Sequence, residues 1–436
     1  MSTVILGGGI IGASIGYYLS ANQPEGEIHI VEQSPELFTA ASGYAAGFLA
    51  RDWFEPSLAP LGAMSFDLHH ELAAAQGGDK KWGFMKGTAF NLDTVAQRKR
   101  GGPRGDDWLR TGTSRAETAS GVEDAVPVAF PEWLTKQKEG ILEEISQEGT
   151  VAQADPLRLS QFLMDGAVSR GVQLHKPAQA SAVIKEGNGV ITGVKIVSLD
   201  SKQETIIPCT NLVLSVGSWT PQVLRDLFPA SRVSFDLSPL AGYSLVVRSP
   251  RYTMEHERNV YQGRSHAVFT THPPSCGFSP EIFLREGGEI YIAGLNSTTM
   301  KLPPSAADTK QLFDPAEMQR LKDVAVRLMG DLAKGATEST DEVVNTDDLE
   351  IIREGLCFRP VGVTGVPTIG RVDDHSLGGV RADPKGGVFI ASGHGPWGIS
   401  LSLGTGKVVS EMIKKQKPSV DVRGLAVQDK GPSSKL

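Results

Sequence analysis

The sequence predicts an α/β fold with two parts: a parallel sheet covered by helices, and a second α+β domain built on an antiparallel sheet. The first part follows from an apolar run at residues 3–6, the glycine-rich turn GGGIIG and a helical pattern that ends before Pro24, because strand, turn and helix in this order open a parallel sheet. The second follows from later stretches of alternating apolar and polar residues, among them AGYSLVVR, EIFLRE and EIYIAGLN.

Composition and charge narrow the functional classes. The chain has 436 residues, 40% of them hydrophobic and 21% charged, which is the balance of a globular protein. A net charge of −7 gives no general attraction for nucleic acid or anionic membranes, and we interpret the basic cluster RKRGGPRG, residues 98–105, as a solvated loop. Because Cys209, Cys276 and Cys357 form no CxxC pair, neither a disulfide framework nor a metal site is predicted.

The first 23 residues carry no charged side chain, as a signal peptide or a membrane span would, but they contain five glycines. A signal peptide also needs a basic start, whereas the first Lys or Arg is Arg51. We therefore expect no signal peptide and no membrane span, and we expect the fold to begin at once.

The glycine-rich turn has the spacing of a dinucleotide-binding site. Gly7 lets the chain turn sharply, Gly9 lets the backbone approach a pyrophosphate, and Gly12 lets the helix pack closely on the strand. Ile10 and Ile11 begin the helix, whose unpaired N–H groups attract phosphate charge. These five residues are the first predicted cofactor contacts.

The second strand supports the same interpretation. EIHIVE, residues 27–32, ends in Glu32, which lies 20 residues after Gly12 and is suited to bind ribose hydroxyls. A carboxylate at this position disfavours a 2′-phosphate, so NADP is the least favoured dinucleotide. An NAD domain would continue with further strand–helix units, whereas this chain runs into the small-residue segment TAASGYAAGFLARDW, which favours FAD.

GGGIIG, the following VEQ and the segment between Ser42 and Leu49 resemble the D-amino-acid oxidase superfamily of flavoproteins, which includes glycine oxidase, monomeric sarcosine oxidase and fungal fructosyl-amino-acid oxidases. SGYAAGFLARDW and FRPV are most similar to fungal members. The resemblance implies a glutathione-reductase-type Rossmann domain that binds FAD. It also implies cofactor contacts at Gln33, Ser34, Ser42, Gly43 and Gly47.

Three later segments resemble the family in order along the chain. A helical stretch from Ala154 precedes a strand that would place Ala180 near the adenine, and LVLSVGSWTPQVL would bring Gly217 and Trp219 towards the cofactor. The closing strand, glycine turn and helix begin at Val388, with the helix expected from about residue 398. Its amino end would stabilise negative charge on the reduced flavin. The implied contacts in this turn are Gly393, Gly395, Gly398 and Ile399.

REGLCFRPVG, residues 353–362, resembles the family segment beside the flavin ring. In the sarcosine and fructosyl-amine branch, a cysteine here is joined to the flavin 8α-methyl group. Cys357 is therefore either a covalent anchor of FAD or a buried free thiol. In the D-amino-acid and glycine oxidase branch, an arginine two places later binds the substrate carboxylate. Arg359 either has this role or pairs with a carboxylate of its own domain.

Two further catalytic candidates, His394 and Trp397, lie in the closing glycine turn. The sarcosine branch has a lysine at the position of Trp397, and glycine oxidase has an arginine at the position of Pro396. His394 is either a base or a support for the backbone of the turn. On the strands of the second domain, Tyr243 and Arg285 are candidate pocket residues without a motif.

The expected organisation is discontinuous. Residues 1–50, 150–225 and 350–415 are predicted to form the FAD-binding domain, and residues 51–149 and 230–345 the substrate domain. Residues 416–436 are predicted to be a mobile tail. The chain ends in Ser434, Lys435 and Leu436, a peroxisomal import signal that a receptor reads. We therefore expect a peroxisomal protein, with a cytoplasmic pool as an alternative.

The function implied by the resemblance is oxidation of the C–N bond of an amine or amino acid by hydride transfer to flavin N5. Oxygen would then reoxidise the flavin and give hydrogen peroxide, beside an imine product. Two alternatives stay open: a flavin monooxygenase that uses NAD(P)H, and a non-catalytic trafficking or scaffold protein that carries FAD.

Overall fold

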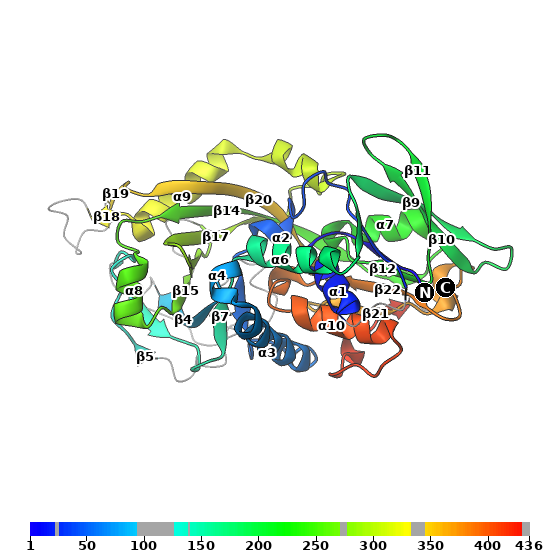
Figure 1. Cartoon of the computed structure of the whole chain (residues 1–436). Helices are drawn as coiled ribbons and strands as arrows, with labels where there is room; N and C mark the ends of the chain where they lie inside the picture. Colours follow the sequence, from blue (N-terminus) through cyan, green and yellow to red (C-terminus); the bar gives the residue numbers. More distant parts are fainter. Residues whose placement is uncertain (22–25, 94–125, 138–139, 271–276, 333–344, 430–436) are drawn as a thin grey trace, which may run out of the picture.

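The structure is a computed structural model, and it describes residues 1–21, 26–93, 126–137, 140–270, 277–332 and 345–429. The basic cluster at 98–105, Cys276 and the import signal at 434–436 lie outside the described residues. The molecule is elongated, with a parallel sheet at one end and a larger, mostly antiparallel sheet at the other (Figure 1).

Within the described residues, six strands form the parallel sheet, in which only the edge strand β21 runs antiparallel to its neighbour. All residues of β1, β2, β12 and β22 are buried, because both faces of this sheet are covered. In spatial order the strands are β21 (Thr368–Arg371), β22 (Gly387–Ser392), β12 (Asn211–Leu214), β1 (Thr3–Leu6), β2 (Ile28–Val31) and β8 (Gln173–His175).

Alternate side chains of the central strand β1 point to opposite faces of the sheet, and each face has its own hydrophobic core. Ile5 packs with the helices of one face, whereas Val4 and Leu6 point to the opposite face, where β9–β11 and α7 lie. The helices of the first face are α1 (Ile10–Ser20), α6 (Pro156–Ser169) and α10 (Ser402–Ile413). The opposite face carries β9 (Ala178–Lys185), β10 (Ile191–Ser198), β11 (Glu204–Pro208) and α7 (Thr220–Leu227).

The larger sheet holds ten strands of the described chain and is antiparallel except where β4 runs parallel to β15. Strands β3 and β7 attach to it beside β4. The attached strands are β3 (Phe48–Ala50) and β7 (Val151–Gln153). In spatial order the other strands are β20 (Glu350–Gly362), β14 (Leu237–Arg248), β17 (Glu289–Ser297), β16 (Glu281–Arg285), β15 (Ser265–Thr270), β4 (Met85–Asp93), β6 (Ile141–Glu144) and β5 (Val126–Pro127).

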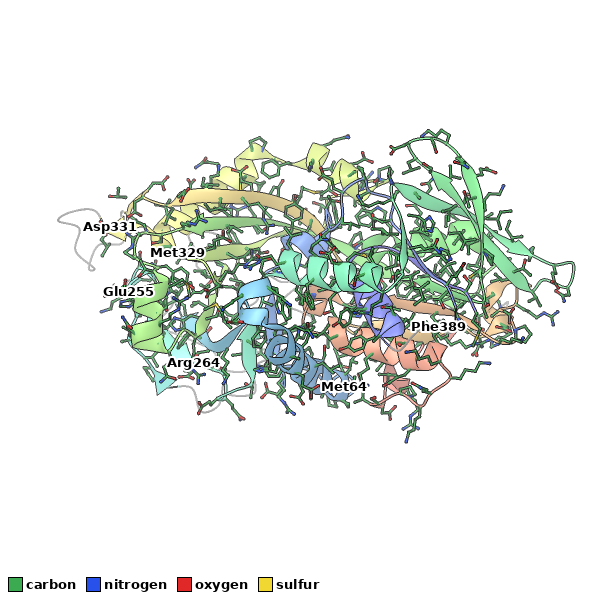
Figure 2. All side chains as sticks on the ribbon, in the orientation of Figure 1. Met64, Glu255, Arg264, Met329, Asp331 and Phe389 are labelled. Atoms are coloured by element: carbon green, nitrogen blue, oxygen red, sulfur yellow. The ribbon has the colours of Figure 1, made fainter. Side chains whose placement is uncertain are left out.

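One face of the larger sheet packs against α9 (Pro315–Met329), with Leu321, Leu328 and Met329 in the core between them. The other face turns towards the helices of the parallel sheet, and Phe283 and Tyr291 share one core with Ile10 and Leu403. Met329 and Asp331 lie at the opposite end of the molecule from Phe389 of the parallel sheet (Figure 2). The region where the two sheets face each other is therefore the centre of the molecule.

Shorter elements complete the fold. The further helices are α2 (Ala41–Tyr44), α3 (Ala59–Gln76), α4 (Gly78–Trp82) and α8 (Met254–Tyr261). The 3₁₀ turns are η3 (Gly217–Trp219), η4 (Ala306–Leu312), η5 (Asp374–Leu377), η6 (Gly395–Trp397) and η7 (Arg423–Leu425). The two-residue strands are β13 (Val233–Ser234), β18 (Asp331–Leu332), β19 (Asn345–Thr346) and β23 (Gln428–Asp429). In the part of the chain described, no helix is long and apolar enough to span a membrane.

The predicted fold class is confirmed, and three details differ from the expectations. The segment 350–415 includes β20, which pairs with β14 of the larger sheet, so one strand connects both parts of the molecule. The closing helix begins at Ser402, because the chain after Gly393 first forms the 3₁₀ turn η6. The expected mobile tail packs on the molecule as far as residue 429, since Val422 and Leu425 are buried.

Candidate active site

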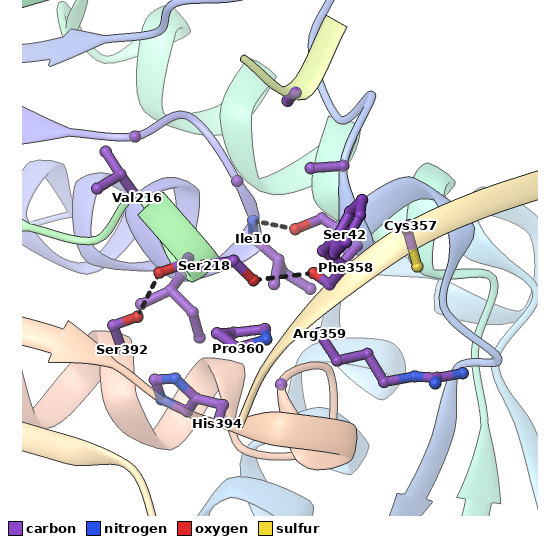
Figure 3. Close-up of a pocket in the computed structure, with 18 of the residues that line it drawn as sticks. Ile10, Ser42, Val216, Ser218, Cys357, Phe358, Arg359, Pro360, Ser392 and His394 are labelled. Atoms are coloured by element: carbon purple, nitrogen blue, oxygen red, sulfur yellow. Dashed lines mark hydrogen bonds between the residues drawn. The ribbon is translucent and has the colours of Figure 1, made fainter. Parts of the chain in front are cut away.

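A cavity lies between the carboxyl ends of the parallel strands and the larger sheet (Figure 3). This edge of a parallel sheet is where such folds bind ligands. The cavity extends from the end of β2 to the face of β17 and β20. Most of the predicted site residues line it, namely Gly7, Gly9, Ile10, Ile11, Glu32, Gln33, Ser42, Gly47, Ala180, Gly217, Trp219, Cys357, Arg359, His394, Gly395, Gly398 and Ile399.

The turn between β1 and α1 is shaped by two glycines. Gly7 has φ of +101°, and a Cβ there would lie 2.5 Å from the carbonyl oxygen of Ser215. A Cβ on Gly12 would lie 2.0 Å from the carbonyl oxygen of Gly7, so no other residue fits under this turn. The backbone therefore presents the amino end of α1 to the cavity, which suits the phosphates of a dinucleotide.

Glu32 lines the cavity and also stabilises the turn between β1 and α1 by hydrogen bonds. Its Oε2 accepts a hydrogen bond from the Gly8 N–H and its Oε1 accepts one from the Ser34 N–H, both at 2.8 Å. Each carboxylate oxygen keeps a further lone pair that a ribose hydroxyl can use. Ser34 itself lies outside the described cavity lining. The glycine cradle, the helix end and this carboxylate together fit an FAD-type cofactor.

The small-residue segment closes over the first turn of α1. The Ser42 hydroxyl accepts a hydrogen bond of 2.9 Å from the Ile10 N–H (Figure 3). Gly43 lies against the chain instead of the cavity, because a Cβ there would lie 2.2 Å from the Phe38 carbonyl oxygen. On the opposite wall the Trp219 indole lines the cavity and donates to the Pro303 carbonyl at 2.7 Å.

Strand β20 presents alternate side chains to two environments. Leu356 and Phe358 pack in the core under α9, while Cys357 and Arg359 line the cavity, which Phe358 also borders. The Phe358 carbonyl accepts a hydrogen bond of 3.2 Å from the Ser218 hydroxyl (Figure 3). A strand of the larger sheet is thereby tied to the turn that follows β12 of the parallel sheet.

The guanidinium of Arg359 binds a neutral group. Its Nη1 donates a hydrogen bond of 2.6 Å to Oδ1 of Asn296 on β17. Among the described residues, no carboxylate oxygen lies within 4.0 Å of this guanidinium. In the described part of the chain, Arg359 therefore does not pair with a carboxylate of its own domain, which was the alternative to substrate binding.

Cys357 is a buried thiol, 4% exposed, in the same wall. Burial raises its pKa, and the neighbouring cations Arg359 and Arg353 act in the opposite direction. His394 is 3% exposed, and its Nε2 lies 3.1 Å from the Thr405 hydroxyl of α10. Burial lowers the pKa of His394 to about 3, so the ring is neutral at physiological pH and supports the turn.

Some predicted residues lie away from the cavity. Trp397 is outside the described lining and packs against Phe54, with ring centroids 5.0 Å apart, so we assign it no part in catalysis. Gly12 and Gly393 are likewise outside the lining. The expectation for Tyr243 is wrong, because its side chain packs in the core under α9 and its hydroxyl accepts a hydrogen bond from the Asp314 N–H.

The expectation for Arg285 is also wrong. Arg285 is 3% exposed, and its guanidinium donates to the carbonyls of Ala45 and Ala46 at 2.7 and 3.0 Å. Arg285 therefore fixes the small-residue segment and does not face a ligand. Three further residues, Tyr291, Asn296 and Glu281, line the wall of the cavity that the larger sheet forms, and no sequence motif marks them. EIYIAGLN was recognised as a strand, but only the pairing of β17 with β14 and β16 shows which side chains face the cavity.

The fold and the cavity define a dinucleotide-binding α/β protein. Residues 2–412 match the family described as FAD dependent oxidoreductase (DAO), and the chain belongs to this family. The resemblance inferred from the glycine-rich turn and the later segments is thereby confirmed. FAD is the cofactor of the family, and its members are oxidoreductases.

Relatives of similar length support the assignment. A protein of Schizosaccharomyces pombe named "Putative oxidoreductase C1F5.03c" is 26% identical over 94% of this chain and 93% of its own length. Glycine oxidase from Geobacillus kaustophilus has a similar structure, with a TM-score of 0.66, 20% identity and 98% of each chain covered. L-proline dehydrogenase from P. horikoshii also has a TM-score of 0.66, with 16% identity over 98% of this chain and 96% of its own. These two likenesses concern the fold.

Proposed function

We propose that this protein oxidises the C–N bond of an amine that carries a carboxylate, such as an amino acid or an N-substituted amino acid. The observation that carries the proposal is the Arg359 guanidinium, which lines the cofactor cavity and is bound to an amide instead of a carboxylate. A planar, permanently charged group in this position suits bidentate binding of a substrate carboxylate. The names of the similar structures, an amino-acid oxidase and an amino-acid dehydrogenase, support this substrate class.

The chain offers FAD a defined set of partners. The turn at Gly7 and Gly9 with the first turn of α1 would hold the diphosphate, Glu32 the ribose, and the β9 backbone at Ala180 the adenine. The closing turn at Gly395 would lie beside the reactive ring. When bound, FAD supplies the two-electron acceptor for the hydride that leaves the substrate.

The side chains of the cavity orient the substrate and exclude water. Arg359 would hold the carboxylate and so limit the positions that the reacting carbon can occupy. The amine must be neutral when it reacts, and the neutral ring of His394 adds no positive charge to the site. In this proposal oxygen is the final electron acceptor.

The proposal includes the attachment of FAD. Cys357 lies on the same face of β20 as Arg359 and lines the same cavity. Because its sulfur lies in the wall that would face the flavin, we propose that Cys357 is joined covalently to the cofactor. Burial raises the pKa of this thiol, and Arg359 and Arg353 oppose that rise. The link would replace the S–H bond and one C–H bond of the flavin methyl group, and oxygen, the proposed electron acceptor, would take up the two electrons released.

Replacement of the arginine tests the substrate class. A panel of D-amino acids, N-methyl amino acids, cyclic imino acids and sugar-modified amino acids is first screened for anaerobic bleaching of the bound FAD. For an active substrate, we expect Arg359→Leu to weaken binding by about a hundredfold or more, because a charged hydrogen-bonded partner is lost. The matched amine without a carboxylate should lose less than about threefold.

Arg248→Leu serves as the control, because Arg248 lies on β14 of the same sheet, outside the described cavity lining, and pairs with Glu289. It should leave carboxylate binding in the wild-type range. Equal losses for acidic and neutral amines in the Arg359→Leu protein would contradict the role proposed for Arg359. Failure of every amine in the panel to bleach the flavin would contradict the proposed reaction.

A further inference from the structure

We propose that Asn296 is a positioning and specificity residue that holds Arg359 in place without neutralising it, so that the full guanidinium charge is reserved for a substrate carboxylate. This inference rests on the proposed function, because it explains how the carboxylate selectivity of the cavity is built. Asn296 lies on β17 outside any sequence motif, and its role does not follow from the family match.

The contact spans three strands. Arg359 of β20 crosses β14 and reaches Asn296 of β17, with Nη1 and Oδ1 2.6 Å apart. Gly242 of β14 is aligned with Cys357 on one side and with Asn296 on the other. A Cβ on Gly242 would lie 2.6 Å from Nη1 of Arg359 and 2.7 Å from Oδ1 of Asn296. The path of the arginine side chain therefore requires a glycine on the intervening strand.

The charge of the group that pairs with Arg359 determines how strongly the guanidinium can attract a charged ligand. A carboxylate in contact with the guanidinium would attract it as strongly as a bound substrate carboxylate could, and would therefore cancel much of the attraction for the substrate. Arg251 has such a partner, since its Nη1 lies 2.6 Å from Oδ2 of Asp348. An amide oxygen accepts the same hydrogen bond but carries no net charge. Asn296 thus fixes the geometry of Arg359 without neutralising its charge.

The amide nitrogen of Asn296, Nδ2, is a hydrogen-bond donor beside the Arg359 guanidinium. Arginine has donors only, so Oδ1 of Asn296 must face the guanidinium and Nδ2 is left with its two hydrogens. Both Asn296 and Arg359 line the cavity. A carboxylate bound to Arg359 can therefore accept a second hydrogen bond from Nδ2. On the facing turn, Pro396 has no backbone N–H to offer.

Asn296→Asp separates this role from simple structural support. Aspartate has nearly the same shape and would keep, or strengthen, the hydrogen bond to Arg359, but it would neutralise the site. We expect the FAD-loaded Asn296→Asp protein to bind butyrate about a hundredfold more weakly than wild type, while the dissociation constant of the neutral butyramide changes by less than about threefold. Both constants are measured by perturbation of the flavin absorbance and by calorimetry.

Asn296→Leu provides a second, uncharged variant. It removes the hydrogen bond and the extra donor but leaves the charge of Arg359, so we expect butyrate binding to weaken by only about tenfold. FAD content and melting temperature show whether each variant is folded. The order of affinity for butyrate, wild type above Asn296→Leu above Asn296→Asp, is the pattern that supports the inference.

The outcomes distinguish this inference from the proposed function. If wild type does not bind butyrate, or if Arg359→Leu binds it equally well, the proposed role of Arg359 is wrong. If Arg359→Leu loses butyrate but Asn296→Asp binds it as wild type does, Asn296 only supports the fold and the inference is overturned. Unchanged butyrate binding in Asn296→Leu overturns it in the same way, including when Asn296→Asp does not fold.

Discussion

At the scale of single residues, the cavity face of β20 brings a thiol and two guanidinium groups together. Cys357 is buried, which disfavours its thiolate and raises its pKa, while Arg359 and Arg353 favour the thiolate. The thiolate is the form that can attack an electrophilic carbon of a bound cofactor. A buried cysteine without such neighbours behaves as a small apolar side chain. In the proposed covalent attachment, formation of the Cys357 thiolate would therefore depend on these two cationic neighbours.

Replacement of Cys357 by serine tests the covalent link. We expect the yellow colour of wild type to stay with the protein after acid precipitation, whereas the Cys357→Ser protein should release its FAD into the supernatant, because a hydroxyl at this position is a much weaker nucleophile than a thiolate. Cys209→Ser is the control, since Cys209 is also a buried free thiol but lies outside the described cavity lining. Release of FAD from wild type would show that the cofactor is not covalent.

At the scale of elements, the turn between β1 and α1 depends on close backbone packing. Gly7 takes a left-handed conformation that brings its carbonyl under the first turn of α1, directly against Gly12. Glu32 from the end of β2 and Ser42 from α2 then bind backbone N–H groups of the same turn. Three elements are thus joined around the place where the phosphates would bind.

The tight packing at Gly12 predicts a large effect of one methyl group. A Cβ there would lie 2.0 Å from a backbone oxygen that cannot move without opening the turn. We expect Gly12→Ala to reduce bound FAD to less than about a tenth of wild type and to cost about 2–4 kcal/mol of stability. Bound FAD is measured by the ratio of flavin to protein absorbance, and stability by urea unfolding.

Gly187→Ala is the matched control for this substitution. No described heavy atom lies within 4 Å of a Cβ built on Gly187, and its φ is not left-handed. We expect this variant to keep wild-type FAD content and stability within about 0.5 kcal/mol. Similar losses in both variants would show that the turn is not the cause.

At the scale of the whole molecule, buried titratable groups on different elements link stability to pH. Burial lowers the pKa of His69 on α3 and of His266 on β15 to about 4, and that of His394 to about 3. Between those values and the unfolded value near 6.5, the unfolded chain binds protons that the folded chain does not. These three histidines therefore reduce the stability as the pH falls below about 6.5.

Glu257 acts in the opposite direction. Its side chain is fully buried on α8, and burial with the nearby charge of Glu132 raises its pKa to about 7. Between about pH 4.5 and pH 7 the folded chain holds a proton on Glu257 that the unfolded chain has lost, so this group reduces the stability as the pH rises. The three histidines and Glu257 together leave a net difference of about two protons near pH 5.5, or about 3 kcal/mol per pH unit.

Two single variants should change this slope in opposite directions. His266→Leu removes one histidine, so we expect the stability to fall about 1.4 kcal/mol less per pH unit between pH 6 and pH 5 than in wild type. Glu257→Gln removes the opposing group and should steepen the fall by the same amount. Urea unfolding at pH 5.0, 5.5 and 6.0 measures both slopes. A change of the same sign in the two variants would contradict the assignment.

Some residues of the candidate site could be predicted from the sequence, and others could not. Gly7, Gly12 and Glu32 could be found because their roles depend on neighbours close in sequence: a strand, a turn, a helix and the next strand. Cys357 and Arg359 were recognised as one segment of a family. Tyr243 and Arg285 were misplaced, and Asn296 was missed, because their roles depend on which face of a strand points to the cavity. A shift of one residue in pairing reverses that face.

The import signal at 434–436 lies outside the described residues and stays a prediction. By itself, the sequence determined the local, short-range features of this protein: the strand–turn–helix unit, the position of its carboxylate and the order of the family segments. These follow from backbone sterics and from the spacing of residues along the chain. Only the tertiary structure decided that Arg359 crosses Gly242 to meet a neutral amide. That contact joins three strands whose pairing is determined by the packing of the whole sheet and not by any one segment.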